Sequence, residues 1–407
     1  MLGLSDGKIE ATESVREHLD LCLDCRGCET ACPSGVIYHE LIEETRARLA
    51  ATQTLTAQGR LMRWLFFNVF VHPTRLKLAL LPARLLQKVG VYPLLRRLGL
   101  FRMLPSQLRK MEQMLPEAGG LWPRSLPPKT QSSVRLRSPR AVLSSQSSFP
   151  PQHSALSTQH SPPKVGFFSG CIGAVMFDEV NRKAVELLAA CGADVIAPRE
   201  QVCCGAIHHH NGAHHPAEEM ARRNIDTFVP KDGPPVDFIV TTVAGCGAML
   251  REYDVLLRDD PAYAQRARDF VSRVRDVTEV LAELGLPAMK YRVDETVTYH
   301  DACHLAHAQK VTAAPRKLLA MVPGLKLVPL PESDMCCGAA GTYNLTQPGM
   351  ATQLAARKLG NIAATGATTC VTGNVGCAMQ IRSEAVARGK ALRVLHPVEL
   401  LHQAVFG

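Results

Sequence analysis

The chain has 407 residues, 46% of them apolar and 20% charged, which is enough sequence for two or three domains with well-buried cores. Its 14 cysteines, together with a mixed acidic and polar N-terminus that lacks the apolar stretch of a signal peptide, predict a reducing compartment and metal ligation rather than disulfides. The formal net charge of +9 is regional: residues 60–110 hold 11 Lys or Arg and no Asp or Glu. Leucine rather than polar residues separates these basic side chains, so a nucleic-acid-binding function is disfavoured.

Four cysteines lie close together near the N-terminus, in a stretch that reads CLDCRGCETACP. The spacing C-x₂-C-x₂-C-x₃-C followed by proline is the bacterial ferredoxin run, and it predicts a [4Fe–4S] cluster. Zinc is disfavoured, because structural zinc prefers two separated C-x₂-C pairs. Helices are expected before and after this run, at Thr12–Leu21 and Tyr38–Ala51, which makes residues 1–55 a helical ferredoxin-like module. The expected cluster ligands are Cys22, Cys25, Cys28 and Cys32.

Two interpretations stay open for Cys32. In two-cluster ferredoxins the fourth cysteine of a run ligates the other cluster. This chain has a single run, so either Cys32 completes the one cluster, or a second run upstream is missing from this chain.

Residues 56–118 form a basic, leucine-rich segment in which short helices are expected. The predicted breaks are at Pro73, Pro82, Pro93 and Pro105. No apolar run approaches the length that spans a bilayer. The helices could lie on an anionic membrane surface, or they could pack against a partner subunit and the rest of this chain; packing is the simpler expectation.

Residues 119–164 are rich in Ser, Pro and Gln and contain a seven-residue repeat over 141–161. No pair of positions in the repeat stays apolar, so a coiled coil is excluded. Such a composition buries too little apolar surface to offset the entropy of ordering, and the segment is expected to be a disordered linker.

From residue 165 onward the chain repeats itself. Four cysteines recur at offsets of 132, 133, 133 and 131 residues, which indicates a duplicated domain with halves at 165–290 and 291–407. Short apolar runs alternate with helical patterns in both halves, which predicts an α/β fold with parallel sheets. Several of these cysteines lie just beyond a predicted strand, where ligands collect in parallel sheets. The repeated cysteines are Cys171, Cys203, Cys204 and Cys246 in the first half and Cys303, Cys336, Cys337 and Cys377 in the second.

Each half contains two adjacent cysteines followed by a glycine. Adjacent side chains of an extended backbone point to opposite sides, so a turn, which Gly205 and Gly338 permit, is needed to aim both sulfurs at one metal. We expect the eight repeated cysteines to bind metal, as a second iron–sulfur centre or as zinc. Cys191 and Cys370 are better explained as buried structural residues.

Histidines near these cysteines are weaker candidates. His208–His210 follow the first double cysteine, and we expect at most two of them to ligate metal or relay protons, with a solvent-exposed loop as the alternative. His300 and His304 flank Cys303 and suggest the same roles. The loop after the second double cysteine lacks histidine, so the second half is expected to hold an all-thiolate iron–sulfur centre, with unequal metal occupancy of the halves.

These motifs together resemble a known family. The repeated pattern is similar to the cysteine-rich CCG domain, which occurs twice in one of the heterodisulfide reductase subunits, and the ferredoxin run followed by two CCG domains resembles the iron–sulfur subunit of glycolate oxidase (glycolate dehydrogenase). The similarity covers about residues 10–118 and 165–407. The sequence segments that show this similarity are CLDCRGCETACPSGVIYHEL, CCGAIHHHNG, AGCGAML, YHDACHLAHAQ, CCGAAGTYN and TGNVGCAMQI.

Two departures from the related patterns matter. Members of the glycolate oxidase type usually carry two ferredoxin runs, and this chain has one. In heterodisulfide reductase each CCG domain ends in C-x-x-C, whereas here Val243 and Asn374 replace the first cysteine of that pair. Each half therefore offers four thiolates rather than five, which puts a five-thiolate non-cubane cluster in doubt.

The resemblance implies an electron-transfer subunit that does not turn over alone. A flavoprotein partner would oxidise glycolate or a similar 2-hydroxy acid, and a quinone or another membrane acceptor would receive the electrons. The chain itself has no G-x-G-x-x-G phosphate loop after a strand and supplies no flavin site. Related alternatives are a lactate-utilisation or glycerol-3-phosphate dehydrogenase subunit, and a different class is a heterodisulfide-reductase-like thiol redox enzyme. The expected location is the cytoplasm, with peripheral contact with the inner face of the membrane as an option.

Overall fold

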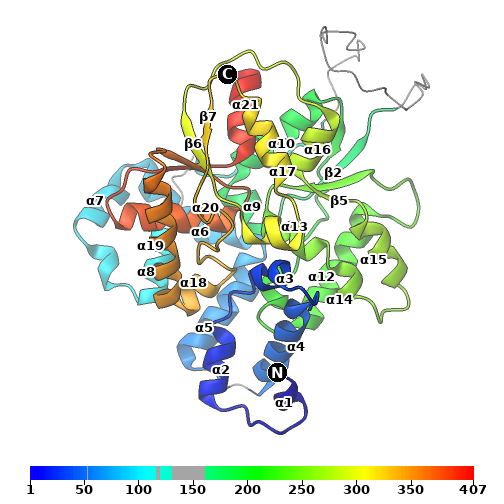
Figure 1. Ribbon diagram of the computed structural model, residues 1–407, viewed down its shortest axis with the longest axis vertical. Coiled ribbons are helices and arrows are strands. Elements are labelled where there is room, and N and C mark those ends of the chain that lie inside the picture. Colours follow the sequence, from blue (N-terminus) through cyan, green and yellow to red (C-terminus); the bar gives the residue numbers. More distant parts are fainter. Residues whose placement is uncertain (53, 116–119, 131–160) are drawn as a thin grey trace.

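The computed structural model describes residues 1–52, 54–115, 120–130 and 161–407, and it contains two separate β-sheets (Figure 1). The first sheet has the order β1-β3-β2-β4-β5, and all its pairings are parallel except that of β1 with β3. Its strands are β1 (Lys129–Thr130), β2 (Lys164–Phe167), β3 (Asp194–Ile196), β4 (Phe238–Thr241) and β5 (Val274–Asp276).

The second sheet repeats the parallel part of the first. Its order is β7-β6-β8-β9, with every pairing parallel, so β6, β7, β8 and β9 take the places of β2, β3, β4 and β5. This repetition confirms the predicted α/β class with parallel sheets in a duplicated domain. The strands are β6 (Thr296–Tyr299), β7 (Lys326–Val328), β8 (Thr369–Val371) and β9 (Arg393–Leu395).

Helices connect the strands and join the two halves. The C-terminal helix α21 packs against α10 of the first half, and α16 packs against α17. Buried residues of both sheets, such as Val165 and Val297, therefore belong to one continuous apolar cluster. The first half contains α9 (Cys171–Met176), α10 (Asp178–Ala190), α11 (Ala206–His209), α12 (His214–Phe228), α13 (Ala244–Leu250), α14 (Tyr253–Leu256), α15 (Ala264–Val271) and α16 (Val277–Leu284). The second contains η3 (His304–Ala308), α17 (Ala313–Ala320), α18 (Tyr343–Thr346), α19 (Pro348–Ala364), α20 (Val375–Ala387) and α21 (Pro397–Phe406).

The N-terminal region is the helical module that the sequence predicts. After the short α1 (Leu2–Ser5) come α2 (Glu13–Asp20), α3 (Gly27–Ala31) and α4 (Tyr38–Ala51). The hydroxyl of Thr12 accepts a hydrogen bond from the backbone of the first turn of α2, which is the usual N-cap arrangement. Arg16 of α2 donates to the Leu49 carbonyl at 2.8 Å, and Arg46 of α4 donates to the Leu19 carbonyl at 2.9 Å, so the two helices are tied together on either side of the cysteine loop.

The basic segment is helical, but one predicted break is wrong. Pro73, Pro93 and Pro105 lie at or next to helix N-termini, where a missing N–H costs nothing, whereas Pro82 lies inside α6. The helix continues through Pro82 because α6 is held on both sides of it by packing against η1, α7 and α9. The elements are α5 (Ala57–Leu65), η1 (Phe66–Phe70), α6 (Pro73–Lys88), α7 (Val91–Arg97), η2 (Leu100–Met103) and α8 (Ser106–Gln113).

This segment packs against the rest of the chain and still presents apolar side chains outward. Met62 and Phe66 form a small core with Leu345 of the second half, and Arg84 donates to the Val175 carbonyl at 2.6 Å. Within the described residues no single helix is long and apolar enough to cross a membrane; α6 and α7 reach that length and apolarity only together, and they are bent by 89°. The side chains that remain exposed include Leu61, Trp64, Leu78, Leu85, Leu94, Leu98 and Met103.

The predicted linker is partly structured at its ends. Lys129–Thr130 forms the antiparallel edge strand β1 against β3, and β2 begins at Lys164, so disorder over all of 119–164 is wrong. The reason is local, because Leu126 packs against the main core and anchors this stretch. Most of the seven-residue repeat lies outside the described residues, and its predicted disorder stays a prediction.

Candidate metal centres

The cysteine loop between α2 and α4 is tightly curled. Asp24 and Arg26 adopt left-handed backbone conformations, with φ of 51° and 62°, and α3 then begins at Gly27. Such a path is unusual for non-glycine residues and turns the backbone amides inward. The Asp24 amide donates to the Cys22 sulfur at 3.4 Å, and the Gly27 amide donates to that of Cys25. The loop thus provides the amide-lined thiol environment that an iron–sulfur cluster requires.

Three thiols of this loop influence one another electrostatically. Burial raises the pKa of Cys25 to about 11, and the neighbouring thiols of Cys336, Cys22 and Cys28 contribute to the rise. Crowded thiolates repel each other unless a cation lies between them, so this group fits a cluster. Cys32 has a separate environment, in which backbone amides of Val36 and Ser34 lower its pKa.

The first duplicated half brings its four cysteines together at the carboxyl ends of β2 and β4. Cys171 begins α9, Cys246 lies in α13, and the sulfurs of Cys171 and Cys203 are 3.5 Å apart. Hydrogen bonding between the thiols and burial raise the pKa of Cys171, and the pKa of Cys246 is also raised. Three of these cysteines are buried and Cys246 is partly buried.

Two buried polar side chains hold the backbone of this first double cysteine. The Tyr253 hydroxyl donates to the Cys204 carbonyl at 2.9 Å, and the Asn224 amide donates to the Cys203 carbonyl at 3.1 Å. Gly205 follows with φ of 92°, as the turn argument predicts. Sequence reasoning did not single out Tyr253 or Asn224, because their partners are main-chain atoms.

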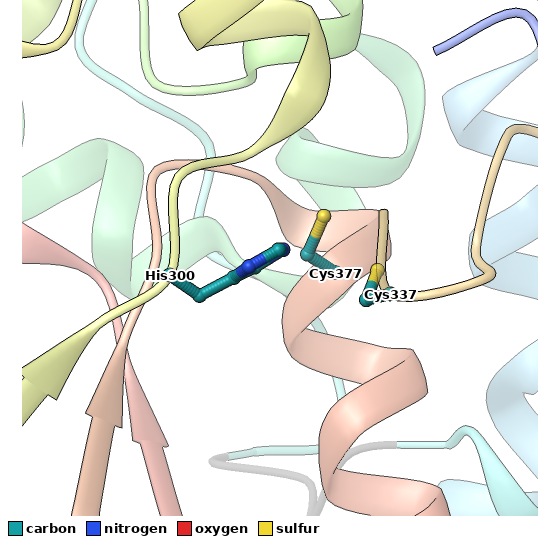
Figure 2. A group of neighbouring side chains, drawn as sticks. All are labelled: His300, Cys337 and Cys377. Carbon is teal, nitrogen blue, oxygen red and sulfur yellow. The ribbon is translucent and has the colours of Figure 1, made fainter. Parts of the chain in front are cut away.

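The second half has the same arrangement of thiols but adds a nitrogen. Cys303 follows β6, Cys377 lies in α20, and Cys336 and Cys337 precede Gly338, whose φ is 85°. Figure 2 shows the imidazole of His300 pointing toward Cys337 and Cys377. One donor atom from each of these three residues lies within 4.8 Å of the others, and all three residues are buried. The loop after the second double cysteine lacks histidine, as predicted, but His300 approaches the thiols from the end of β6, and the all-thiolate iron–sulfur centre stays a prediction.

The thiols of the second half differ in their tendency to ionise. Interaction with the Cys337 thiol foremost, and then with the nearby imidazole of His300, lowers the pKa of Cys377. The Asn374 amide also donates to the Cys377 sulfur at 3.4 Å. Asn374 stands where related CCG domains carry a cysteine, so the substitution that removes a ligand supplies a hydrogen bond to a remaining one.

The histidine triplet after the first double cysteine contacts the N-terminal module, where donor atoms of His210, Glu43 and Asp24 lie within 4.8 Å of one another, so metal ligation by His210 stays a prediction. His209 and His210 donate to the carboxylate of Glu43 on α4, at 2.9 and 2.8 Å, and the ring of His208 packs at a tilt against Phe67 with ring centroids 4.3 Å apart. Two histidines are engaged, as the sequence analysis allowed, but their partner is a carboxylate of the N-terminal module. Glu43 belongs to no local motif, so no pattern along the chain could have pointed to it.

The cysteine loop itself lies against the second half. Thr30 of α3 and His307 of η3 form a hydrogen bond of 3.0 Å, and the Tyr343 hydroxyl donates to the Leu21 carbonyl at 3.0 Å. Cys336 also lies near enough to Cys25 to contribute to its raised pKa. Figure 1 shows α3 just below α13, between the N-terminal helices and the duplicated domain.

Comparisons with known proteins agree with this architecture. A cysteine-rich (CCG) domain model matches residues 165–251 and 297–382, and a model for the linker region of the glycolate oxidase iron–sulfur subunit matches residues 58–115. A probable glycolate oxidase iron–sulfur subunit of Bacillus subtilis (strain 168) is 35% identical over 99% of this chain and 86% of its own length. This chain belongs to the glycolate oxidase iron–sulfur subunit family.

Other relatives show the breadth of the family. The glycolate oxidase iron–sulfur subunit of Escherichia coli (strain K12) is 30% identical over 97% of this chain and 84% of its own length. Lactate utilization protein A of Shouchella clausii (strain KSM-K16) is 32% identical over 58% of this chain and 98% of its own length. The basic segment is therefore part of the family's architecture, while the shorter lactate-type relative aligns with only part of the chain.

Proposed function

We propose that this chain is the electron-transfer subunit of a flavin-dependent 2-hydroxy-acid dehydrogenase with glycolate as its substrate. Family membership supports the coarse assignment, and the two near-full-length relatives named for glycolate oxidase favour glycolate. The relative named for lactate utilization makes lactate the second candidate. A flavoprotein subunit would remove two electrons from the hydroxy acid, and this chain would pass them singly toward a quinone or another membrane acceptor.

The loop after α2 would hold a [4Fe–4S] cluster. Such a cluster, when bound, accepts and donates single electrons. Cys22, Cys25 and Cys28 would be ligands, with Cys32 as the fourth in a single-cluster arrangement. The surrounding residues would exclude water and balance the charge of the cluster. Arg26 lies in the loop, is 6% exposed, and forms an ion pair with Glu252 of the first half.

The observation that carries this proposal is the placement of the cysteine loop against a second group of thiols. Cys25 lies close enough to Cys336 and Cys303 for the thiols to affect one another's titration, and α3 contacts η3 directly. The loop that would hold the cluster is thus enclosed against a second candidate metal centre, as expected of a cluster buried inside an electron-transfer subunit. A thiol–disulfide enzyme would instead need thiols that a substrate can reach, and Cys336, Cys337 and Cys377 are at most 5% exposed.

The outward apolar side chains of the basic segment suggest where partners dock. Trp64, Leu78 and Leu98 are each more than half exposed among Arg and Lys residues. We assign this face to the flavoprotein subunit or to the membrane that contains the electron acceptor, with the protein in the cytoplasm. Exposed apolar residues flanked by cations suit either an anionic lipid surface or a protein partner.

The test is an activity reconstitution. Purified alone, the chain should show no glycolate-dependent dye reduction; purified with its flavoprotein partner subunit, the complex should reduce the dye. Parallel assays with glycolate and lactate identify the substrate. Robust turnover by the isolated, flavin-free chain would contradict the subunit assignment.

A further inference from the structure

We propose that His300 is a metal ligand through Nε2, and that the second half binds a single transition-metal ion, zinc or ferrous iron, with a mixed imidazole–thiolate ligand set. The first half, at the equivalent position, offers no nitrogen. This difference concerns the two duplicated sites and holds whichever hydroxy acid the complex oxidises. Donor atoms of His300, Cys337 and Cys377 lie within 4.8 Å of one another, and Cys336, whose thiol hydrogen-bonds with that of Cys337, would be the fourth ligand.

The tautomer of His300 is fixed by its backbone partner. Nδ1 lies 3.0 Å from the carbonyl oxygen of Ser333, and because a carbonyl can only accept, Nδ1 carries the proton. Nε2 then has a free lone pair. A metal-ligating histidine typically donates its other ring N–H to a carbonyl in this way, which orients the ring.

No nitrogen or oxygen donor in the described part of the chain satisfies that lone pair. His300 is fully buried, and Nε2 has no nitrogen or oxygen hydrogen-bond partner among the described residues; the polar group that interacts with the ring on that side is the weakly donating thiol of Cys377. An unsatisfied polar atom in the interior is costly and calls for an explanation. The ring points at Cys337 and Cys377, so a metal between the nitrogen and the sulfurs would remove the cost (Figure 2).

The spacing of the donors suits a single ion. Bonds of about 2.0–2.3 Å in a tetrahedral site place neighbouring donors about 3.3–3.8 Å apart. The donors of His300, Cys337 and Cys377 lie within 4.8 Å of one another, which small rotamer adjustments can close. In a four-iron cluster each thiolate binds a different iron, which requires the sulfurs to stand farther apart.

The surrounding charges also suit a metal with three thiolates. Three thiolates and a divalent ion leave one net negative charge. Lys358, which is fully buried, lies near Cys337 and Cys377 and donates to the Ser333 carbonyl at 3.3 Å, the same oxygen that holds His300. One cation therefore balances the centre and orients its nitrogen ligand.

The first half is an internal comparison. The offset that relates Cys303 to Cys171 places His300 opposite Phe168, and the offset at Cys377 places Asn374 opposite Val243. Phe168 is fully buried and packs against Phe228. The first half thus keeps the four sulfurs and lacks the imidazole, so the two sites should differ in coordination.

The experiment compares His300→Phe, which copies the first half, with the wild-type chain after anaerobic purification. Zinc and iron per chain are measured by mass spectrometry in both proteins. If the variant loses one of these metals, X-ray absorption spectroscopy at the edge of that metal in the wild-type chain counts its nitrogen and sulfur neighbours. His396→Phe is the matched control, because His396 is also buried after a strand of the same sheet but its Nε2 already bonds the Thr242 carbonyl. We expect His300→Phe to lose about one metal ion per chain and the control to keep it.

A second variant covers the case in which His300→Phe does not fold. His300→Cys should retain the metal with the nitrogen neighbour replaced by sulfur. Loss of zinc identifies zinc as the occupant, and loss of iron without loss of sulfide identifies a single iron. Unchanged metal content in His300→Phe, an unchanged nitrogen count in His300→Cys, or loss of sulfide along with iron would overturn the proposal.

Discussion

The contact between Glu43 and the histidine pair is expected to hold the N-terminal module on the duplicated domain. Glu43 is 5% exposed and accepts from His209 at 2.9 Å and His210 at 2.8 Å. Hydrogen bonds to a charged group contribute about 1.5–3 kcal/mol each. Glu43→Gln keeps one carbonyl acceptor and loses the charge, so the free energy of opening the module should fall by about 2–3 kcal/mol.

Hydrogen exchange measures this opening directly. A loss of about 2–3 kcal/mol makes exchange of the α4 amides about 30- to 150-fold faster. Glu44→Gln is the control on the same helix: Glu44 is exposed, and its pair with Arg48 is worth little. If both variants exchange equally, or if Glu43→Gln changes the rate less than threefold, the carboxylate–histidine contact does not hold the module.

The pH dependence follows from the same contact. Burial alone would lower the pKa of His210, but Glu43 raises it above the ordinary value of 6.5. Its stabilising contribution is therefore complete below about pH 6.5 and is lost as the pH rises through the raised pKa. Burial raises the pKa of Asp24 to about 6, which also favours the docked state at lower pH. The opening free energy of the wild-type chain should fall as the pH rises above about 6, through the pKa of Asp24 and the raised pKa of His210, and Glu43→Gln should flatten that fall.

Three further outcomes are expected. Replacing the first three cysteines of the ferredoxin run with serine should abolish the electron paramagnetic resonance signal of the reduced cluster, and a signal of unchanged size would refute the ligand assignment. Deleting residues 131–161 should leave cluster content and complex activity largely intact, because their composition buries little apolar surface; loss of folded protein would contradict this. Gly338→Ala should reduce the metal content of the purified protein more than Gly341→Ala. Both glycines have a positive φ, which costs a residue with a side chain about 1–2 kcal/mol. Only at Gly338 would the added Cβ also lie 2.6 Å from the Ala351 carbonyl oxygen. Equal metal content in the two glycine variants would show that this close approach is unimportant.

Features that depend on local spacing could be predicted from the amino-acid sequence. The ferredoxin run is a loop whose ligands lie within eleven residues, and the helix at Tyr38–Ala51 was predicted with its observed bounds. The duplication was readable because four cysteines kept register, and alternating apolar runs and helical patterns implied parallel sheets, whose carboxyl ends carry Cys171 and Cys303. These signals are short-range or periodic, so they can be recognised without knowing which residues are in contact in the folded chain.

Contacts between groups that are distant in the sequence could not be predicted and are known from the folded chain. Glu43 and His210 are 167 residues apart, and no pattern along the chain links a carboxylate on α4 with a histidine on the far side of the basic segment. No local pattern predicts that Cys25 lies beside Cys336. No local pattern predicts either that α6 continues through Pro82, because packing on both sides of the proline holds the helix. His300 was visible as a neighbour of Cys303, yet its ligand geometry depends on the Ser333 carbonyl, which a separate loop brings to Nδ1. Spacing along the chain selects the chemistry of a ligand, whereas its direction and partners are set by the packing of distant elements.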